Sequence, residues 1–291
     1  MMSVKGGGGS GTPSYHVRLV PKTRGIHLGL GEVWRYRDLV LLLTKKTFTM
    51  TYQQTLLGPL WILLHPVFSS LVHMLVFGRI AGIGTGGVPG ILFYFASMAV
   101  WEMFAYSLHT NAQTFISSAH LFSKVYFPRL SVPFSGLLVS LLKFCIQLIV
   151  ILPMWTVYLI RGDIHPVLPA LPLLPLLLLQ LSMLGMSVGV LLSSLTTRYR
   201  DLMHLVGVGT SLWMYASAVV YPLDALPPGR LRSLITLNPV TQIMELIRRI
   251  TLGEGMFSLP RYLFGVALTL LLFLAGAAVF SHVERTFEDT I

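Results

Sequence analysis

The sequence TYQQTLLGPLWILLHP, residues 51–66, marks the place where the chain changes character. Scattered basic residues precede it, and mostly apolar residues follow it for more than 200 positions. Gly58 suits a steep turn of the backbone, and Pro59 suits a first helical turn, where its missing N–H costs little. We therefore predict a membrane boundary here, with Trp61 anchoring the first spanning helix at the interface.

The composition is that of a membrane protein. Of the 291 residues, 54% are hydrophobic and only 11% are charged, whereas soluble domains carry about a quarter charged residues. The net charge of +10 comes without a long basic stripe or an aromatic RNA-binding motif, so nucleic acid is not an expected partner. Cys145 is the single cysteine, which excludes an internal disulfide. We predict an all-α polytopic membrane protein.

Six segments reach the length of about 20 apolar residues that a helix needs to cross the hydrocarbon core. They cover about residues 60–81, 91–112, 131–160, 168–195, 202–222 and 261–282. Residues 1–31 contain GGGGSG and are expected to form a flexible tail, whereas residues 32–291 form the transmembrane domain. Lys and Arg concentrate before the first span and in the second and fourth loops. The positive-inside rule therefore places the N- and C-termini in the cytoplasm.

Two further helices are expected outside the spans. Residues 32–55 mix leucines with lysines, a pattern typical of an amphipathic helix in the cytoplasmic interface. In the outer loop, residues 241–253 have one apolar helical face, and Arg248 and Arg249 lie outside it. Asn-Pro before this segment and glycine after it are typical helix start and stop signals. This second helix is expected to dip into the outer leaflet.

The sequence provides no recognisable site for covalent chemistry. It contains no P-loop, no HExxH or GxSxG motif and no paired-cysteine metal motif, so we expect no ATPase site and no metal centre in this chain. Glu102 is the one acidic residue inside a proposed span, which gives little support to an ion-coupled carrier. A membrane glycosyltransferase would need a carboxylate-rich site that the sequence lacks.

Lys143 lies about 12 residues into the third span, where a lysine is costly unless it pairs, snorkels or faces water. One interpretation is a lysine that lines a polar passage and meets an anionic substrate. The other is a lysine shielded in a tilted helix or at a subunit contact. The many aromatic residues of the spans also allow two interpretations, an interfacial belt with ordinary core packing or a channel lining on which sugar rings stack.

The loop ISSAHLFSKVYFPRLSVP, residues 116–133, is short, aromatic and basic. Ser117 or Ser118 is expected to cap a short helix that Pro128 ends. Such a helix suits docking into a groove on another protein. The alternative is a plain connector with two orienting charges.

Several motifs together resemble one family in their order and spacing. These motifs are YQQTLLGPLW followed by HP, VFGRIAG, SKVYFPR, TTRYRDL, YP and LNPV. They are similar to the membrane subunits of bacterial ABC-2 type polysaccharide exporters, which move O-antigen and are related to exporters of teichoic acids. The resemblance covers about residues 32–291.

The resemblance implies a transport subunit that is not itself an enzyme. Its relatives are homodimers of six-span subunits in the bacterial inner membrane, bound to two copies of an ATP-binding cassette subunit that holds ATP and Mg. Residues 226–253 would form short re-entrant helices of an external gate, and the joint at Gly58 and Pro59 would be a hinge. The expected substrate is a polyprenyl-diphosphate-linked glycan, whose diphosphate Lys143 would favour.

The resemblance also implies roles for individual residues. Contact with the ATPase would be made by Ser118, His120, Leu121, Phe122, Lys124 and Tyr126. The channel at the homodimer interface would be lined by Trp61, Phe68, Phe104, Tyr106, Trp213 and Tyr215, and by Lys143, where family members do not usually have a lysine. Alternative functions are an ABC-2 permease for teichoic acid or a hydrophobic drug, and a membrane glycosyltransferase.

Overall fold

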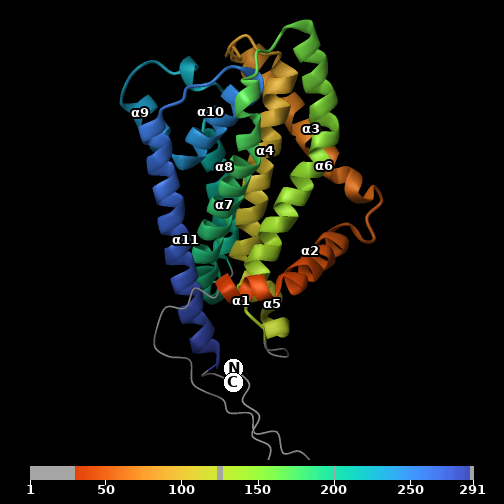
Figure 1. Cartoon of the computed structure of the whole chain (residues 1–291), viewed down its shortest axis with the longest axis vertical. Coiled ribbons are helices and arrows are strands. Elements are labelled where there is room, and N and C mark those ends of the chain that lie inside the picture. The colour runs from red at the N-terminus through yellow and green to blue at the C-terminus, as the bar shows by residue number, and fades with distance from the viewer. Residues whose placement is uncertain (1–29, 123–126, 200, 289–291) are drawn as a thin grey trace, which may run out of the picture.

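The computed structural model describes residues 30–122, 127–199 and 201–288, and every regular element in these ranges is a helix. Figure 1 shows the long helices packed side by side in one bundle. The α-helices are α1 (Leu30–Arg35), α2 (Arg37–Tyr52), α3 (Trp61–His73), α4 (Gly90–Ala112), α5 (Thr114–Phe122), α6 (Ser131–Arg161), α7 (Leu174–Arg198), α8 (Leu202–Tyr215), α9 (Arg230–Leu237), α10 (Pro239–Leu252) and α11 (Leu259–Glu288). The 3-10 or π-helical pieces are η1 (Gly58–Leu60), η2 (Met74–Ile80), η3 (Leu168–Leu173) and η4 (Leu223–Ala225).

Five of the helices in the described ranges are long and apolar enough to cross a membrane. They cover Gly58–Ile80, Gly90–Ala112, Ser131–Arg161, Leu168–Thr197 and Leu259–Phe280. Five of the six predicted segments are thus long apolar helices whose bounds agree with the prediction to within a few residues, and they are candidates for membrane spans.

The remaining predicted span, residues 202–222, is not one long helix. α8 ends at Tyr215 after 14 residues, a length of about 21 Å, which is shorter than the hydrocarbon core of about 30 Å. Beyond it the chain unwinds, and Ala218 has a positive φ of 51°. Hydropathy measures the transfer of side chains into lipid and does not detect where the backbone leaves the helix. The apolar run of residues 202–222 was therefore predicted as one continuous helix.

α4 is the most buried of the spans and lies at the centre of the bundle, against α3, α6 and α7. Its contact with α7 is closest at two glycines of α7. A Cβ on Gly185 would lie 2.7 Å from the Phe104 carbonyl oxygen, and one on Gly189 would lie 2.4 Å from that of Leu108. Only glycine permits this approach, which is the small-residue packing that holds membrane helices together.

The two ends of the bundle carry different short helices. α1, α2 and α5 lie toward one end, with the last turns of α11, whereas α9 and α10 lie at the opposite end (Figure 1). We call these the α5 end and the α9 end. α2 packs on α6 and buries Val40 and Leu43, while it exposes Leu41 and Leu42. Residues 32–55 are therefore helical as far as Tyr52, with a break at Tyr36.

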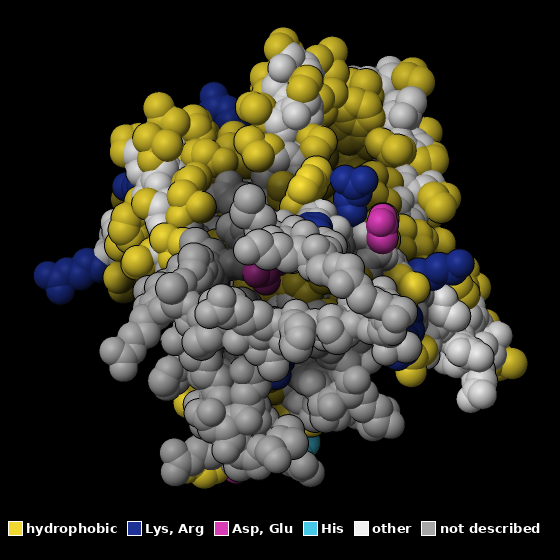
Figure 2. Space-filling model, turned by 60° about the horizontal axis from the view of Figure 1, so that its bottom comes forward, with side chains coloured by type: hydrophobic (Ala, Val, Ile, Leu, Met, Phe, Trp, Pro, Cys, Tyr) yellow, Lys and Arg dark blue, Asp and Glu magenta, His cyan; other side chains and the backbone are white. Residues whose placement is uncertain are grey.

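Hydrophobic side chains cover the flanks of the bundle, as Figure 2 shows from the α5 end. Ile80, Ile149 and Ile160 are 75%, 66% and 81% exposed. Apolar surface this continuous is typical of a face that meets lipid or another protein chain.

Candidate functional site

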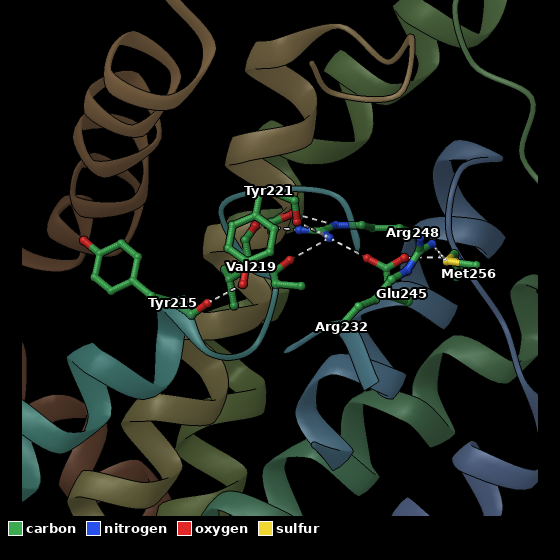
Figure 3. A network of polar contacts seen from close by, with 9 residues as sticks. Tyr215, Val219, Tyr221, Arg232, Glu245, Arg248 and Met256 are labelled. Atoms are coloured by element: carbon green, nitrogen blue, oxygen red, sulfur yellow. Dashed lines mark hydrogen bonds and ion pairs between the residues drawn. The ribbon is translucent and has the colours of Figure 1, made fainter. Parts of the chain in front are cut away.

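Arg248 lies inside the bundle although it carries a charge. It projects from α10 and is only 4% exposed. Its guanidinium donates to Glu245 Oε1 at 2.8 Å and twice to the Ser97 hydroxyl of α4, at 2.9 and 3.1 Å. It also lies 4.3 Å from the centroid of the Phe93 ring. Buried charges persist where they are paired and hydrogen-bonded, and both conditions are met here (Figure 3).

The same guanidinium holds the unwound chain that follows α8. It donates to the carbonyl oxygens of Ala218 at 2.8 Å, Val219 and, at 3.4 Å, Tyr221. Non-helical backbone at membrane depth is stable only where the protein satisfies its polar groups. Arg248 therefore replaces helical hydrogen bonds that residues 216–221 have lost.

The caps of α10 position this arginine. The Asn238 side chain accepts from the Val240 N–H at 3.0 Å and donates to the Ala216 carbonyl at 3.2 Å. Gly253 follows the last residue of α10 with a left-handed φ of 87°. The predicted start and stop of this helix are thus confirmed. Glu245 is 1% exposed, and its second oxygen accepts from the Met256 N–H at 2.9 Å.

The helical periodicity places Arg248 off the apolar face of α10, yet the structure buries it. The paired Glu245 was not among the residues that the sequence singled out. One available signal was the spacing, because residues three positions apart on a helix are neighbours and opposite charges there can pair. What surrounds this pair, namely α4 and the segment after α8, depends on contacts that the sequence does not reveal.

A second polar cluster surrounds a cavity of about 300 Å³ between the end of α2 and helices α3, α4 and α6. The Lys143 Nζ on α6 lies 3.4 Å from the centroid of the Tyr106 ring and 5.4 Å from that of the Tyr52 ring. Cations are attracted to aromatic faces. The two rings therefore provide the partners that a lysine at this position needs.

Glu102 lines the same cavity from α4. Its two carboxylate oxygens lie 2.5 Å from His65 Nδ1 and 3.1 Å from Gln147 Nε2. Gln147 Nε2 also donates to the Ile62 carbonyl at 3.2 Å. These contacts join α3, α4 and α6 just beyond the joint between α2 and α3. Across the described ranges, no group of three or more His, Cys, Asp or Glu side chains is placed to hold a metal ion.

The structure brings only some of the predicted channel residues together. The cavity of the second cluster is lined by three of them, Trp61, Tyr106 and Lys143. The other four lie elsewhere: Phe104 is fully buried and meets the Trp213 ring edge-on at 5.2 Å, whereas Phe68 and Tyr215 are exposed. A single chain therefore does not bring the seven residues into one lining, and their role in a channel stays a prediction.

The predicted ATPase contact falls on α5 and the segment after it. α5 already begins at Thr114, so Ser117 lies inside the helix and its hydroxyl donates to the Gln113 carbonyl at 2.9 Å. Ser117 and Ser118 therefore do not cap this helix, contrary to the sequence prediction. The predicted contact residues within α5 are Ser118, His120, Leu121 and Phe122, whereas Lys124 and Tyr126 lie outside the described residues.

The joint between α2 and α3 has the predicted geometry. Gly58 has a positive φ of 51°, with no atom within 4 Å of where a Cβ would lie. Pro59 lies in the first turn of η1, directly before α3. The steep turn is thus confirmed, and its role as a hinge stays a prediction.

Comparisons with known proteins agree on one family. A family model described as "ABC-2 type transporter" matches residues 38–252. The chain is 26% identical over 261 residues to the O-antigen export system permease protein RfbA of Myxococcus xanthus, covering 89% of this chain and 98% of that protein. Two permeases of the same name from Klebsiella pneumoniae are 24% and 25% identical, each covering 87% of this chain and 95% of theirs.

Proposed function

Because the chain belongs to the ABC-2 type transporter family, we propose that it is the permease subunit of an ATP-driven exporter of an O-antigen-like, lipid-linked polysaccharide. The observation that carries this proposal is the similarity to O-antigen export permeases over 87% or more of the chain. Five long apolar helices suit a multi-pass protein of the bacterial inner membrane.

The permease works as a homodimer with two copies of an ATP-binding subunit, which binds ATP and Mg. Closure of those subunits on ATP displaces α5, which is the element that the family resemblance assigns to their contact. α5 begins two residues after the end of α4, so its displacement reaches the central span directly. The chain itself performs binding, gating and transmission of movement.

The chain crosses the membrane six times, with α8 and the unwound residues after it forming the fifth crossing. α9 and α10 are then re-entrant helices at the outer face. This arrangement is supported by the side-chain hydrogen bonds to residues 216–221, because broken helices are stable within the bilayer only when the protein satisfies their backbone. Both termini are cytoplasmic, because the α5 end, which holds α1 and the last turns of α11, faces the cytoplasm.

The glycan passes between the two copies of the chain. The exposed aromatic residues Phe68 and Tyr215 offer sugar rings a stacking surface on this path. The substrate is anchored to the membrane by a polyprenyl diphosphate.

Co-purification tests the partner, and reconstituted transport tests the substrate. The tagged chain, expressed with the other genes of its locus, should retain an ATPase subunit at one-to-one stoichiometry. Vesicles that contain both subunits should then move a fluorescent lipid-linked glycan across the bilayer only with ATP and Mg. Transport that persists without ATP but stops when an ion gradient is removed would refute the proposal.

A further inference from the structure

We propose that the cavity between α2, α3, α4 and α6 binds the zwitterionic headgroup of a membrane phospholipid, with its phosphate on Lys143 and its amine on Gln147. This binding requires only that the chain lies in a membrane, so it stands independently of the exported substrate.

The position of the cavity suits a headgroup. α6 has 31 residues and is about 46 Å long, roughly 16 Å more than the hydrocarbon core. Lys143 lies about 18 Å from the α5 end of this helix, beside Tyr52 at the end of α2. The sequence pattern of residues 32–55 is that of a helix in the cytoplasmic interface, so a cavity at the end of α2 lies near the lipid headgroups. Its wall includes the exposed side chains of Trp61 and His65, which leaves it accessible from the flank.

One residue of the cavity wall, Gln147, carries a buried acceptor that has no donor. Gln147 is 3% exposed, and its Oε1 has no hydrogen-bond partner among the described residues. The amide nitrogen of the same side chain is already bonded to Ile62 and Glu102. A buried acceptor without a partner is unfavourable, so the occupant is expected to bring an N–H or O–H group.

The charges in the cavity favour a phosphate with a single negative charge as the second group of the ligand. Within the described part of the chain, Lys143 meets the faces of Tyr106 and Tyr52 and has no hydrogen-bond acceptor. Its ammonium donors are therefore available to a phosphate. Glu102 lines the same cavity, and its negative charge would repel a ligand with several negative charges.

These features match phosphoethanolamine, which carries one negative charge and an ammonium with N–H donors. Phosphocholine has the same charges but no N–H for Gln147 Oε1. A lipid diphosphate has excess negative charge beside Glu102. The geometry thus favours a resident phospholipid over the substrate diphosphate that the sequence associates with Lys143.

Native mass spectrometry of the full-length chain tests this inference without any substitution. The purified protein is equilibrated with vesicles of equal parts phosphatidylethanolamine, phosphatidylcholine and phosphatidylglycerol, and the retained lipid is counted. We expect phosphatidylethanolamine to be retained about tenfold over phosphatidylcholine, because one hydrogen bond involving a charged group is worth about this factor. Equal retention of these two lipids would overturn the proposal. So would preferred retention of phosphatidylglycerol, or displacement of the bound lipid by a polyprenyl diphosphate.

Substitutions then locate the site. Lys143→Met should lower the retention of both zwitterionic lipids, because they share the phosphate that Lys143 binds. Gln147→Leu should abolish the preference for phosphatidylethanolamine over phosphatidylcholine. Lys45→Met is the matched control, because Lys45 is exposed on α2 and does not line the cavity. Unchanged lipid retention in Lys143→Met, a preference that survives in Gln147→Leu, or equal losses in Lys45→Met would show that the lipid binds elsewhere.

Discussion

Replacing Arg248 with methionine should destabilise the chain far more than the same replacement at its neighbour Arg249. Arg248 is 4% exposed and bonded to Glu245 and to backbone carbonyls, whereas Arg249 is exposed. Removing one partner of a buried ion pair costs about 3–5 kcal/mol, and surface substitutions usually change stability by less than about 0.5 kcal/mol. We therefore expect a loss of about 3–5 kcal/mol for Arg248→Met and almost none for Arg249→Met.

The free energy of unfolding can be measured for the full chain in detergent micelles, by denaturant titration with tryptophan fluorescence. Adding Glu245→Gln to Arg248→Met should recover part of the loss, because the carboxylate is then no longer buried without its partner. Hydrogen exchange should increase at residues 216–221 in Arg248→Met before it increases in α4. A loss below about 1 kcal/mol, or equal for the two arginines, would show that packing alone holds this segment and would refute the reasoning.

Four further substitutions probe other elements. Gly189→Ala should destabilise the chain by about 1–3 kcal/mol, because its Cβ would meet the α4 backbone. Gly207→Ala on α8 is the matched control: its Cβ would meet nothing within 4 Å, so it should stabilise the chain by about 0.5–1 kcal/mol. Thermal unfolding of the two variants measures this difference. Gly58→Leu places a side chain at a positive φ of 51° and should reduce export while assembly with the ATPase persists; loss of both together would indicate a merely structural turn. Burial raises the pKa of Tyr52 from 10.0 to about 12, so its contribution to stability is complete below pH 10 and is lost as the pH rises toward 12. Tyr52→Phe should remove that part of the alkaline loss of stability, and an unchanged pH profile would contradict it.

The long spans were predictable because a helix that crosses lipid needs an unbroken apolar run, and such runs are visible in one sequence. The turn at Gly58 and the boundaries of α10 followed from local chemistry, since glycine and asparagine act on their own neighbours. The break after Tyr215 was not predictable in the same way. It depends on Arg248, about 30 residues away in the chain, whose side chain donates hydrogen bonds to the backbone carbonyls that the break leaves without helical partners.

The candidate sites were predictable only in part for the same reason. The sequence showed that Lys143 needs a partner, but not that Tyr52 and Tyr106 supply it from two other helices. It gave Glu102 as an isolated acid, whereas the structure gives it His65 and Gln147 as partners. Polar residues in an apolar chain mark where contacts must exist, and the fold decides which contacts these are.

The continuity of α4 has a mechanical consequence. This helix runs unbroken for 23 residues, about 34 Å, with α5 beginning two residues beyond one end. Nearer its other end, Ser97 is bonded to Arg248. Close packing at Gly185 and Gly189 resists sliding of α7 along it. Because helical hydrogen bonds resist stretching and compression, a displacement of α5 along this axis arrives at Arg248 with nearly its full amplitude. The two ends of the bundle are thus connected by one stiff helix with no intermediate break.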